Sequence, residues 1–198
     1  MKLFYSAASP FVRKVMACAI LRGLDGQIET VTTNPHASPA ELLAANPLSK
    51  VPCLIGADGV AYFDSPVICE YLDTLGSAPP MFPPAGPARL RALRLQAMGD
   101  GILDAAVARR GEQGRPREDA RDAAMARMAA AVTRTLAMLE ADPPGEAMNI
   151  GSITIACALG YLDFRFGPEP WRGAHPRLAA WFARVSEQSA IARTVPRG

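Results

Sequence analysis

The sequence predicts a small α/β domain followed by an all-helical domain, and three observations support this division. Strand and helix signals alternate over the first 76 residues, and five prolines fall between Ser77 and Pro87. Beyond them, apolar residues recur at spacings of three and four, which is typical of amphipathic helices. Proline continues neither a helix nor a central strand. We therefore expect domains at 1–76 and 87–198, joined by a linker at 77–86.

Each element of the N-terminal domain has its own local signal. Serine followed by proline supplies an N-cap and a first-turn proline, and this pair occurs three times. An Ala-Asp-Gly turn at 57–59 predicts a hairpin. The expected elements are strand 2–5, a helix from Ser9-Pro10 to about 22, strand 27–31, a helix from Ser38-Pro39 to about 46, strands 51–55 and 60–63, and a helix from Ser65-Pro66 to about 75. Their order is βαβαββα.

The second domain carries four helical signals. The segment from about 149 to 166 is apolar on most faces, so we expect it to be the buried central helix. The others are a segment at about 88–110, a stripe formed by Met125, Met128, Val132, Leu136 and Leu139, and a stripe formed by Leu178, Trp181, Phe182 and Val185.

Composition and charge exclude several classes of protein. The chain has 198 residues, of which 49% are hydrophobic and 20% charged, so disorder is excluded for the whole chain. Lys plus Arg is 21 and Asp plus Glu is 19, and a net charge of +2 gives no reason to expect nucleic acid or an acidic lipid surface. The Arg-rich stretch 89–134 is interleaved with acidic residues and lacks aromatic residues, which predicts solvated helix faces.

Neither a metal nor a membrane is expected. The cysteines, Cys18, Cys53, Cys69 and Cys157, include no CxxC pair, so neither a disulfide framework nor a zinc signature is visible. The N-terminus is a poor signal-peptide core, and the uncharged stretch 149–162 is too short to span a bilayer. We expect a reduced, cytoplasmic compartment.

The order βαβαββα, with a proline near the start of the third strand, is the thioredoxin-like pattern. Its reactive group lies at the N-terminus of the first helix, which Ser9 occupies here. A helix N-terminus favours an anion such as a thiolate. Serine is a poor nucleophile without an adjacent base, so its hydroxyl suits donation to the thiolate of another molecule. Two alternatives stay open: Ser9 is only an N-cap, or Tyr5 at the end of the first strand acts instead.

Two further segments carry the most specific signal. They are NPLSKVPCL at 46–54 and FDSPVICEY at 63–71, behind the opening SPFVRK at 9–14. With these segments the chain resembles the glutathione S-transferases over its whole length, and most closely the bacterial members with a serine at the head of the first helix. The resemblance implies a thioredoxin-like domain followed by an all-α domain, glutathione as cosubstrate, a role in detoxification and a homodimer.

The resemblance also implies roles for individual residues. Pro52 falls where the family has a cis-proline, and Val51 would pair its backbone with the cysteinyl part of glutathione. Ser65 would hold the γ-glutamyl carboxylate and Asp64 the ammonium. Lys50 would face the glycyl carboxylate. Without the resemblance, Ser65 is an N-cap and Lys50 an ordinary exposed lysine.

The implied mechanism is stabilisation of the glutathione thiolate by Ser9, followed by attack on a small electrophile bound between the domains. Asp100 of a partner subunit would reach the glutathione ammonium, although it also fits an ordinary exposed helical acid. One departure concerns the helix beginning near Asn149. The family usually has a carboxylate three residues later, where this chain has Ser152, so we expect a less stable helix start.

Two other classes remain as alternatives. A non-catalytic binding or regulatory protein on the same fold, like the starvation-response proteins that bind RNA polymerase, would have no need for Lys50, Asp64 and Ser65. A thiol reductase would need a cysteine where this chain has Ser9.

Overall fold

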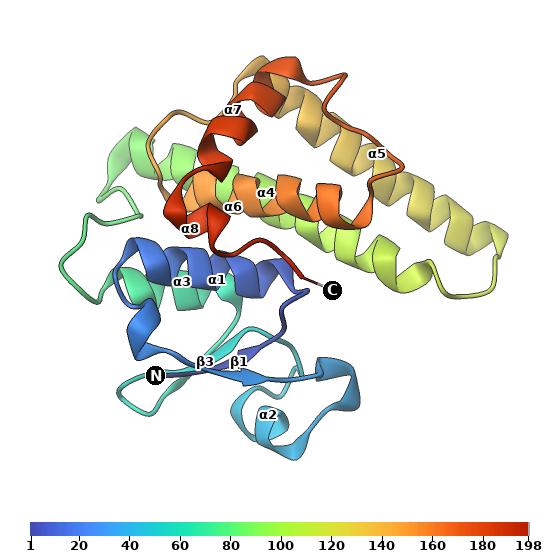
Figure 1. Cartoon of the computed structure of the whole chain (residues 1–198). Helices are drawn as coiled ribbons and strands as arrows, with labels where there is room; N and C mark the ends of the chain where they lie inside the picture. The colour runs from blue at the N-terminus through green and yellow to red at the C-terminus, as the bar shows by residue number, and fades with distance from the viewer. Residues whose placement is uncertain (198) are drawn as a thin grey trace. The chain divides into compact units, whose positions relative to one another are not determined.

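The computed structural model describes residues 1–197, and this part of the chain forms two compact units (Figure 1). The N-terminal unit comprises Met1–Ala85 together with the chain from Ser189 onward, and the helical unit comprises Gly86–Gln188. The expected helical domain, 87–198, therefore differs from the observed unit at its end, because the last residues pack against α1. Within residues 1–197 no helix has both the length and the apolar character needed to cross a membrane.

The N-terminal unit is built on a mixed sheet which, within the described residues, has four strands in the order β2-β1-β3-β4. β1 pairs with β2 in parallel and with β3 antiparallel, and β4 adds antiparallel to β3. The strands are β1 (Lys2–Tyr5), β2 (Glu29–Thr32), β3 (Cys53–Ile55) and β4 (Ala61–Tyr62). The thioredoxin-like class expected from the element order is confirmed.

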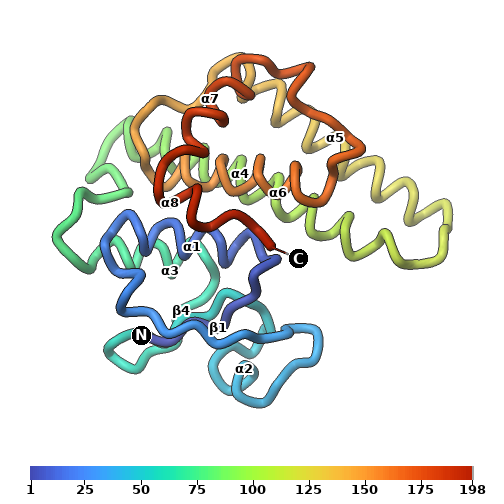
Figure 2. Tube along the Cα trace, in the orientation of Figure 1, coloured from blue at the N-terminus to red at the C-terminus, as the bar shows by residue number. Residues whose placement is uncertain are grey.

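Helices cover both faces of this sheet. α1 (Pro10–Leu21) and α3 (Ser65–Asp73) lie side by side on one face, and α2 (Ala40–Ala45) covers the other (Figures 1 and 2). Phe4, Leu42 and Cys53 form a buried cluster on the α2 side. Short 3-10 turns span Asp25–Gln27 and Pro35–Ala37, and α8 (Ser189–Ala192) packs against α1.

A buried arginine holds the start of the predicted linker. Arg22 is 5% exposed and donates to the Leu75 carbonyl at 2.6 Å and also to the Gly76 and Ala78 carbonyls. The Asp73 carboxylate, 3.6 Å from Arg22 Nε, accepts from the Met81 and Phe82 backbone N–H groups at 2.7 and 3.1 Å. The proline-rich segment is therefore fastened to the ends of α1 and α3 although it forms neither helix nor strand.

The helical unit is arranged around α6. Its helices are α4 (Gly86–Glu112), α5 (Asp119–Ala141), α6 (Ile150–Arg165) and α7 (Pro176–Ser186). α6 is buried continuously from residue 150 to 159, as its apolar composition predicts, and it packs against α4 and α7. The sequence motifs predicted a thioredoxin-like domain followed by a helical domain, as in the glutathione S-transferases. This prediction is confirmed.

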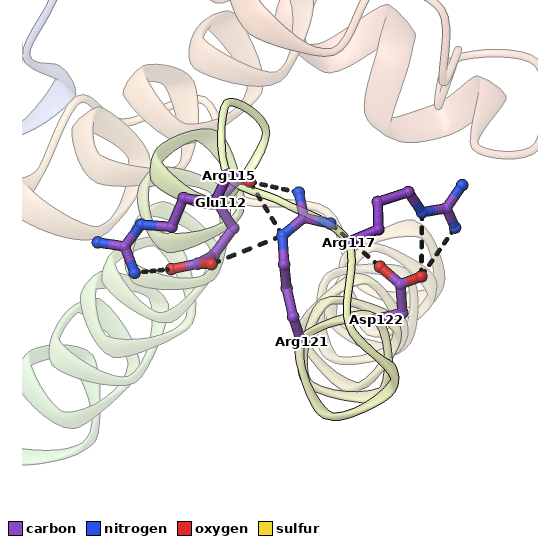
Figure 3. A network of polar contacts seen from close by, with 5 residues as sticks. All are labelled: Glu112, Arg115, Arg117, Arg121 and Asp122. Atoms are coloured by element: carbon purple, nitrogen blue, oxygen red, sulfur yellow. Dashed lines mark hydrogen bonds and ion pairs between the residues drawn. The ribbon is translucent and has the colours of Figure 1, made fainter.

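An ion-pair network closes the turn between α4 and α5 (Figure 3). Arg121 donates to the Glu112 backbone carbonyl and to Asp122 Oδ1, and Arg117 donates through two nitrogens to Asp122 Oδ2. Arg115 donates to Glu112 Oε1 at 3.0 Å. The hydrogen bond from Arg117 lowers the pKa of Asp122 below its ordinary value. Part of the arginine-rich stretch thus serves as a local clamp on a helix hairpin.

Two of the three Ser-Pro pairs begin their helices differently from the prediction. The N-cap of α3 is Asp64, since its carbonyl accepts the first intrahelical bond, from Ile68 N at 3.0 Å. The N-cap of α2 is Pro39 for the same reason, and Ser38 adopts a left-handed conformation with φ 46°. At α1, Ser9 is the N-cap as expected.

The start of α6 carries a complete capping box in spite of the serine at its third position. Asn149 Oδ1 accepts from the backbone N–H groups of Gly151 and Ser152 at 2.9 and 3.2 Å. Ser152 Oγ accepts in return from Asn149 N at 2.8 Å. The hydroxyl therefore fills the reciprocal role that a carboxylate usually takes in this family.

Glycines allow α4 and α6 to approach closely. A Cβ added at Gly99 would lie 2.7 Å from Thr154 Cγ2 and 3.0 Å from the Thr154 backbone carbon. A Cβ added at Gly101, two residues further along α4, would meet nothing within 4 Å.

We predict opposite effects of alanine at these two glycines. Gly99→Ala should lower the free energy of unfolding by about 1 to 3 kcal/mol, because the methyl group must push the α6 backbone away. Gly101→Ala should raise it by up to roughly 1 kcal/mol, because alanine is the better helix former. Chemical denaturation of both variants measures the difference. Equal changes of the same sign would show that the close approach of the two helices is not tight.

Candidate functional site

The strand pairing brings three chain segments to one end of the sheet. Phe4 pairs with Cys53, and Leu54 pairs with Tyr62. Because β3 runs antiparallel to both β1 and β4, the C-terminal ends of β1 and β4 lie beside the N-terminal end of β3. α1 follows β1, and α3 follows β4, so both helices begin at this end of the sheet. Two helix N-termini and the loop before β3 thus define the candidate site.

Ser9 sits at the first of these helix N-termini. Its Oγ accepts a hydrogen bond from Val12 N at 3.3 Å, and its carbonyl accepts from Arg13 N at 3.0 Å. The side chain is half-buried. A serine hydroxyl has one proton and two lone pairs, so the cap bond uses a lone pair and does not use the proton. The first turn of α1 adds unpaired N–H groups and a partial positive charge at the same place.

The loop before β3 is held by the side chain of Asn46, which begins the motif at 46–54 and for which the sequence predicted no role. Asn46, 1% exposed, donates from Nδ2 to the Lys50 carbonyl at 2.9 Å and accepts from Leu48 N at 3.0 Å. The Val51–Pro52 peptide bond that follows is cis, as the resemblance implies. Val51 precedes the β1–β3 ladder, which begins at Cys53. An Asn-Pro pair ahead of a strand is the local signal that could have identified Asn46 as a loop brace.

Asp64 and Ser65 lie at the second helix N-terminus. Ser65 is 2% exposed and is the first residue of α3, whereas Asp64 is exposed and extended at the N-cap position with no side-chain cap bond. An acceptor in front of α3 would face backbone N–H groups with no intrahelical partner. The Asp64 carboxylate supplies a negative charge beside this positive helix end.

The remaining predicted residues fall in different places. Lys50 is exposed and adjacent to Val51 in the loop before β3. Tyr5 ends β1 opposite Thr32 of β2, and it lines a cleft formed with Met16 and Thr30. Asp100 lies in α4 of the helical unit. The structure therefore brings Ser9, Val51 and Ser65 to one end of the sheet.

The cysteines do not offer a thiol to this site. Cys53 follows Pro52 directly, but it is fully buried, and burial raises the pKa of its thiol to about 11. The other cysteines are also buried, and none of them forms a disulfide. Within the described part of the chain, no group of three or more His, Cys, Asp or Glu side chains gathers into a metal site. The available chemistry consists of hydroxyls, backbone N–H groups, helix dipoles and a carboxylate.

Comparison with known proteins assigns the chain to a family. Residues 8–75 match the family model of the glutathione S-transferase N-terminal domain, and residues 122–184 match that of the glutathione S-transferase C-terminal domain. The chain is 33% identical over 201 residues to an uncharacterised GST-like protein, YibF, of Escherichia coli K12, and the match covers 99% of this chain and 98% of that relative. The chain belongs to the glutathione S-transferase family.

Solved structures agree with this assignment. A glutathione transferase family member from Pseudomonas fluorescens Pf-5 with bound glutathione is 38% identical and superposes with a TM-score of 0.93, over 100% of this chain and 99% of that one. A glutathione S-transferase from Methylobacillus flagellatus KT with bound glutathione is 31% identical, with a TM-score of 0.89 over 99% of both chains.

We predict that Asn46→Ala destabilises the protein by removing the side chain that holds the loop before β3. The loss of a buried bridge should lower the free energy of unfolding by roughly 1 to 3 kcal/mol, because the Lys50 carbonyl and the Leu48 N–H lose their partner. Asn34→Ala is the matched control, since Asn34 is exposed and makes a comparable bond to His36 N at 3.1 Å. Denaturant unfolding of both variants gives the comparison. A loss no larger than that of the control would contradict the bracing role of Asn46.

Proposed function

We propose that the chain is a glutathione transferase whose glutathione site is the end of the sheet where α1 and α3 begin. The observation that carries this proposal is the convergence of two helix N-termini on either side of the Val51–Pro52 loop. Glutathione is an extended peptide with a thiol in its middle and a charged group at each end. The arrangement offers one feature for each of these parts.

The thiolate would lie at the N-terminus of α1, with the Ser9 hydroxyl as donor. The capping bond from Val12 N occupies a lone pair of Oγ, so capping and donation are compatible roles of one side chain. A donor and a helix dipole aimed at a sulfur favour its ionised form and lower its pKa. The thiolate would then attack a small electrophile of unassigned structure.

The rest of glutathione would extend along the loop towards α3. Val51 would pair its backbone with the cysteinyl residue, in the manner of a strand added to a sheet. The γ-glutamyl carboxylate would face Ser65 and the first turn of α3, and Asp64 would face the ammonium. Lys50 is adjacent to Val51 and exposed, which suits the glycyl carboxylate.

The position of Tyr5 supports Ser9 as the residue that acts on the thiol. Ser9 is the N-cap of α1, whereas Tyr5 ends β1 and lines a cleft with Met16 and Thr30. We further propose a cytoplasmic homodimer, with Asp100 contributed to the partner's site. Four buried cysteines without a disulfide fit the reducing compartment where glutathione is abundant.

We predict that Ser65→Ala weakens glutathione binding by about 1 to 3 kcal/mol, roughly a five- to hundredfold rise in Kd, because a hydrogen bond to a charged group is lost. Titration calorimetry with glutathione measures the affinity, and Ser77→Ala in the exposed linker is the control. Saturating glutathione at 100 times its Kd should also stabilise the wild-type fold by about 2.7 kcal/mol. If glutathione neither binds to the wild-type chain nor stabilises it, the alternative of a non-catalytic binding or regulatory protein on the same fold is favoured.

We predict that Ser9→Ala raises the pKa of the bound glutathione thiol and slows conjugation of an aryl halide by about ten- to a thousandfold, since one donor to an anion is lost. Ultraviolet absorbance of the thiolate and a conjugation assay give the two readouts. Ser9→Ala also removes a helix cap, so its stability should fall by roughly 1 kcal/mol.

A second substitution separates the two roles of Ser9. Ser9→Asp keeps an acceptor for Val12 N and provides no proton at neutral pH, so it should retain the stability and still lose conjugation. Ser9→Cys should lose conjugation and gain mixed-disulfide exchange with glutathione. Wild-type rates in Ser9→Ala, with the loss found in Tyr5→Phe, would transfer the role to Tyr5.

A further inference from the structure

A cleft of about 340 Å³ lies within the N-terminal unit, on the β2 side of β1. One wall is the side of α1 that carries Met16 and Ile20, a second is the end of β1 with the residues that follow it, and the third is the C-terminal segment 193–197. Ser9, Val51 and Ser65 are not among its lining residues. The cleft therefore contains none of the residues assigned to glutathione, although Ser6 and Val12 of its lining are hydrogen-bonded to Ser9. Its volume falls in the range of small-molecule pockets.

Arg13 is the polar group on which this cleft is built. It lines the cleft and is 6% exposed. Its Nη2 donates to the Ile191 carbonyl at 3.3 Å, and its Nε lies 3.5 Å from Thr194 Oγ1. Its Nη1 is buried and has no hydrogen-bond partner among the described residues. A guanidinium is always charged, and a buried donor of a charged group without an acceptor is costly, so this nitrogen points to an acceptor beyond the described residues.

The charge around the cleft is positive. Arg193 and Arg197 line it in addition to Arg13. Among the described lining residues the opposing charge is Asp25, which is already bound to Arg193 at 2.6 Å. One carboxylate does not neutralise three arginines, so the cleft should attract an anion.

The walls between these charges are mixed, since Ser6, Thr30 and Thr194 contribute hydroxyls beside an apolar surface. Val12, Met16 and Ile20 contribute aliphatic surface, and Tyr5 contributes a ring at the end of β1. A bare inorganic anion would leave this surface without a partner, whereas an anion with an apolar body would cover it.

We propose that this cleft binds a small organic carboxylate with an apolar or aromatic body. The carboxylate accepts from Arg13 Nη1, the body lies against the aliphatic side of α1, and Arg193 and Arg197 attract the charge at the rim. The site goes beyond the proposed glutathione transferase function, because it uses none of the residues assigned to glutathione. Since one wall is the C-terminal segment, the ligand ties residues 193–197 to α1.

Titration calorimetry of the whole chain with benzoate tests the proposal. We expect saturable binding at one site per chain, unchanged by saturating glutathione. Benzyl alcohol, which has the same ring without the charge, should bind about tenfold or more weakly, because the charge-assisted bond is absent. Inorganic phosphate should also bind more weakly than benzoate. Benzoate that does not saturate, competes with glutathione or binds no better than either comparison compound would overturn the proposal.

Two matched pairs of variants locate the binding. Thr30→Phe fills the cleft from the exposed side of β2, and Glu29→Phe places the same ring on the neighbouring exposed residue, whose side chain points to the opposite face of the sheet. Arg193→Gln combined with Arg197→Gln removes the rim charge, and Arg127→Gln is the control on exposed α5 surface. Benzoate affinity should fall at least about tenfold in Thr30→Phe and severalfold in the double variant, and stay unchanged in both controls. Undiminished affinity in Thr30→Phe would show that benzoate binds elsewhere. A chain that fails to bind glutathione but binds benzoate would overturn the proposed function alone.

Discussion

The antiparallel pairing of β3 with β1 is the constraint on which the N-terminal unit depends. This register, Phe4 with Cys53, places both residues against Leu42 in the core on the α2 side. It also places the loop of Val51 and Pro52 beside the ends from which α1 and α3 begin. A slip of one residue would turn every side chain of β3 to the opposite face. The core packing and the geometry of the candidate site are therefore specified by the same pairing.

The order of elements could be predicted because its signals are local. Gly23 ends the first helix, and the turn at 57–59 joins two strands, as the sequence indicates. The N-cap positions were less predictable, since the dipeptide Ser-Pro has three outcomes here. Ser9 caps α1, Ser65 is already inside α3, and Ser38 lies one residue before Pro39, the N-cap of α2. The same dipeptide fits all three positions because its proline is tolerated both at the start of a helix and just before it.

The candidate site was predictable only in part, for a related reason. Ser9, Val51 and Ser65 each lie within a short contiguous motif, so the sequence alone identified them as candidate site residues. The cleft around Arg13 has no such motif, because its partner Ile191 lies 178 residues away in the chain. No local pattern indicates that the last residues leave the helical unit and pack against α1. Contacts of this range depend on tertiary packing, which periodicity and capping signals do not report.

Ser152 shows how a hydroxyl can replace a carboxylate in a buried cap, and the same property underlies the role proposed for Ser9. Ser152 is 1% exposed, accepts from Asn149 N at 2.8 Å and lies 3.0 Å from the Ala147 carbonyl, to which it donates. An ionised carboxylate could accept but not donate, and its burial would be costly. Ser9 likewise accepts from Val12 N and keeps its proton for another acceptor. At Ser152 the chain itself supplies the acceptor for the proton, whereas at Ser9 the thiolate of a bound glutathione is the acceptor that the proposed mechanism requires.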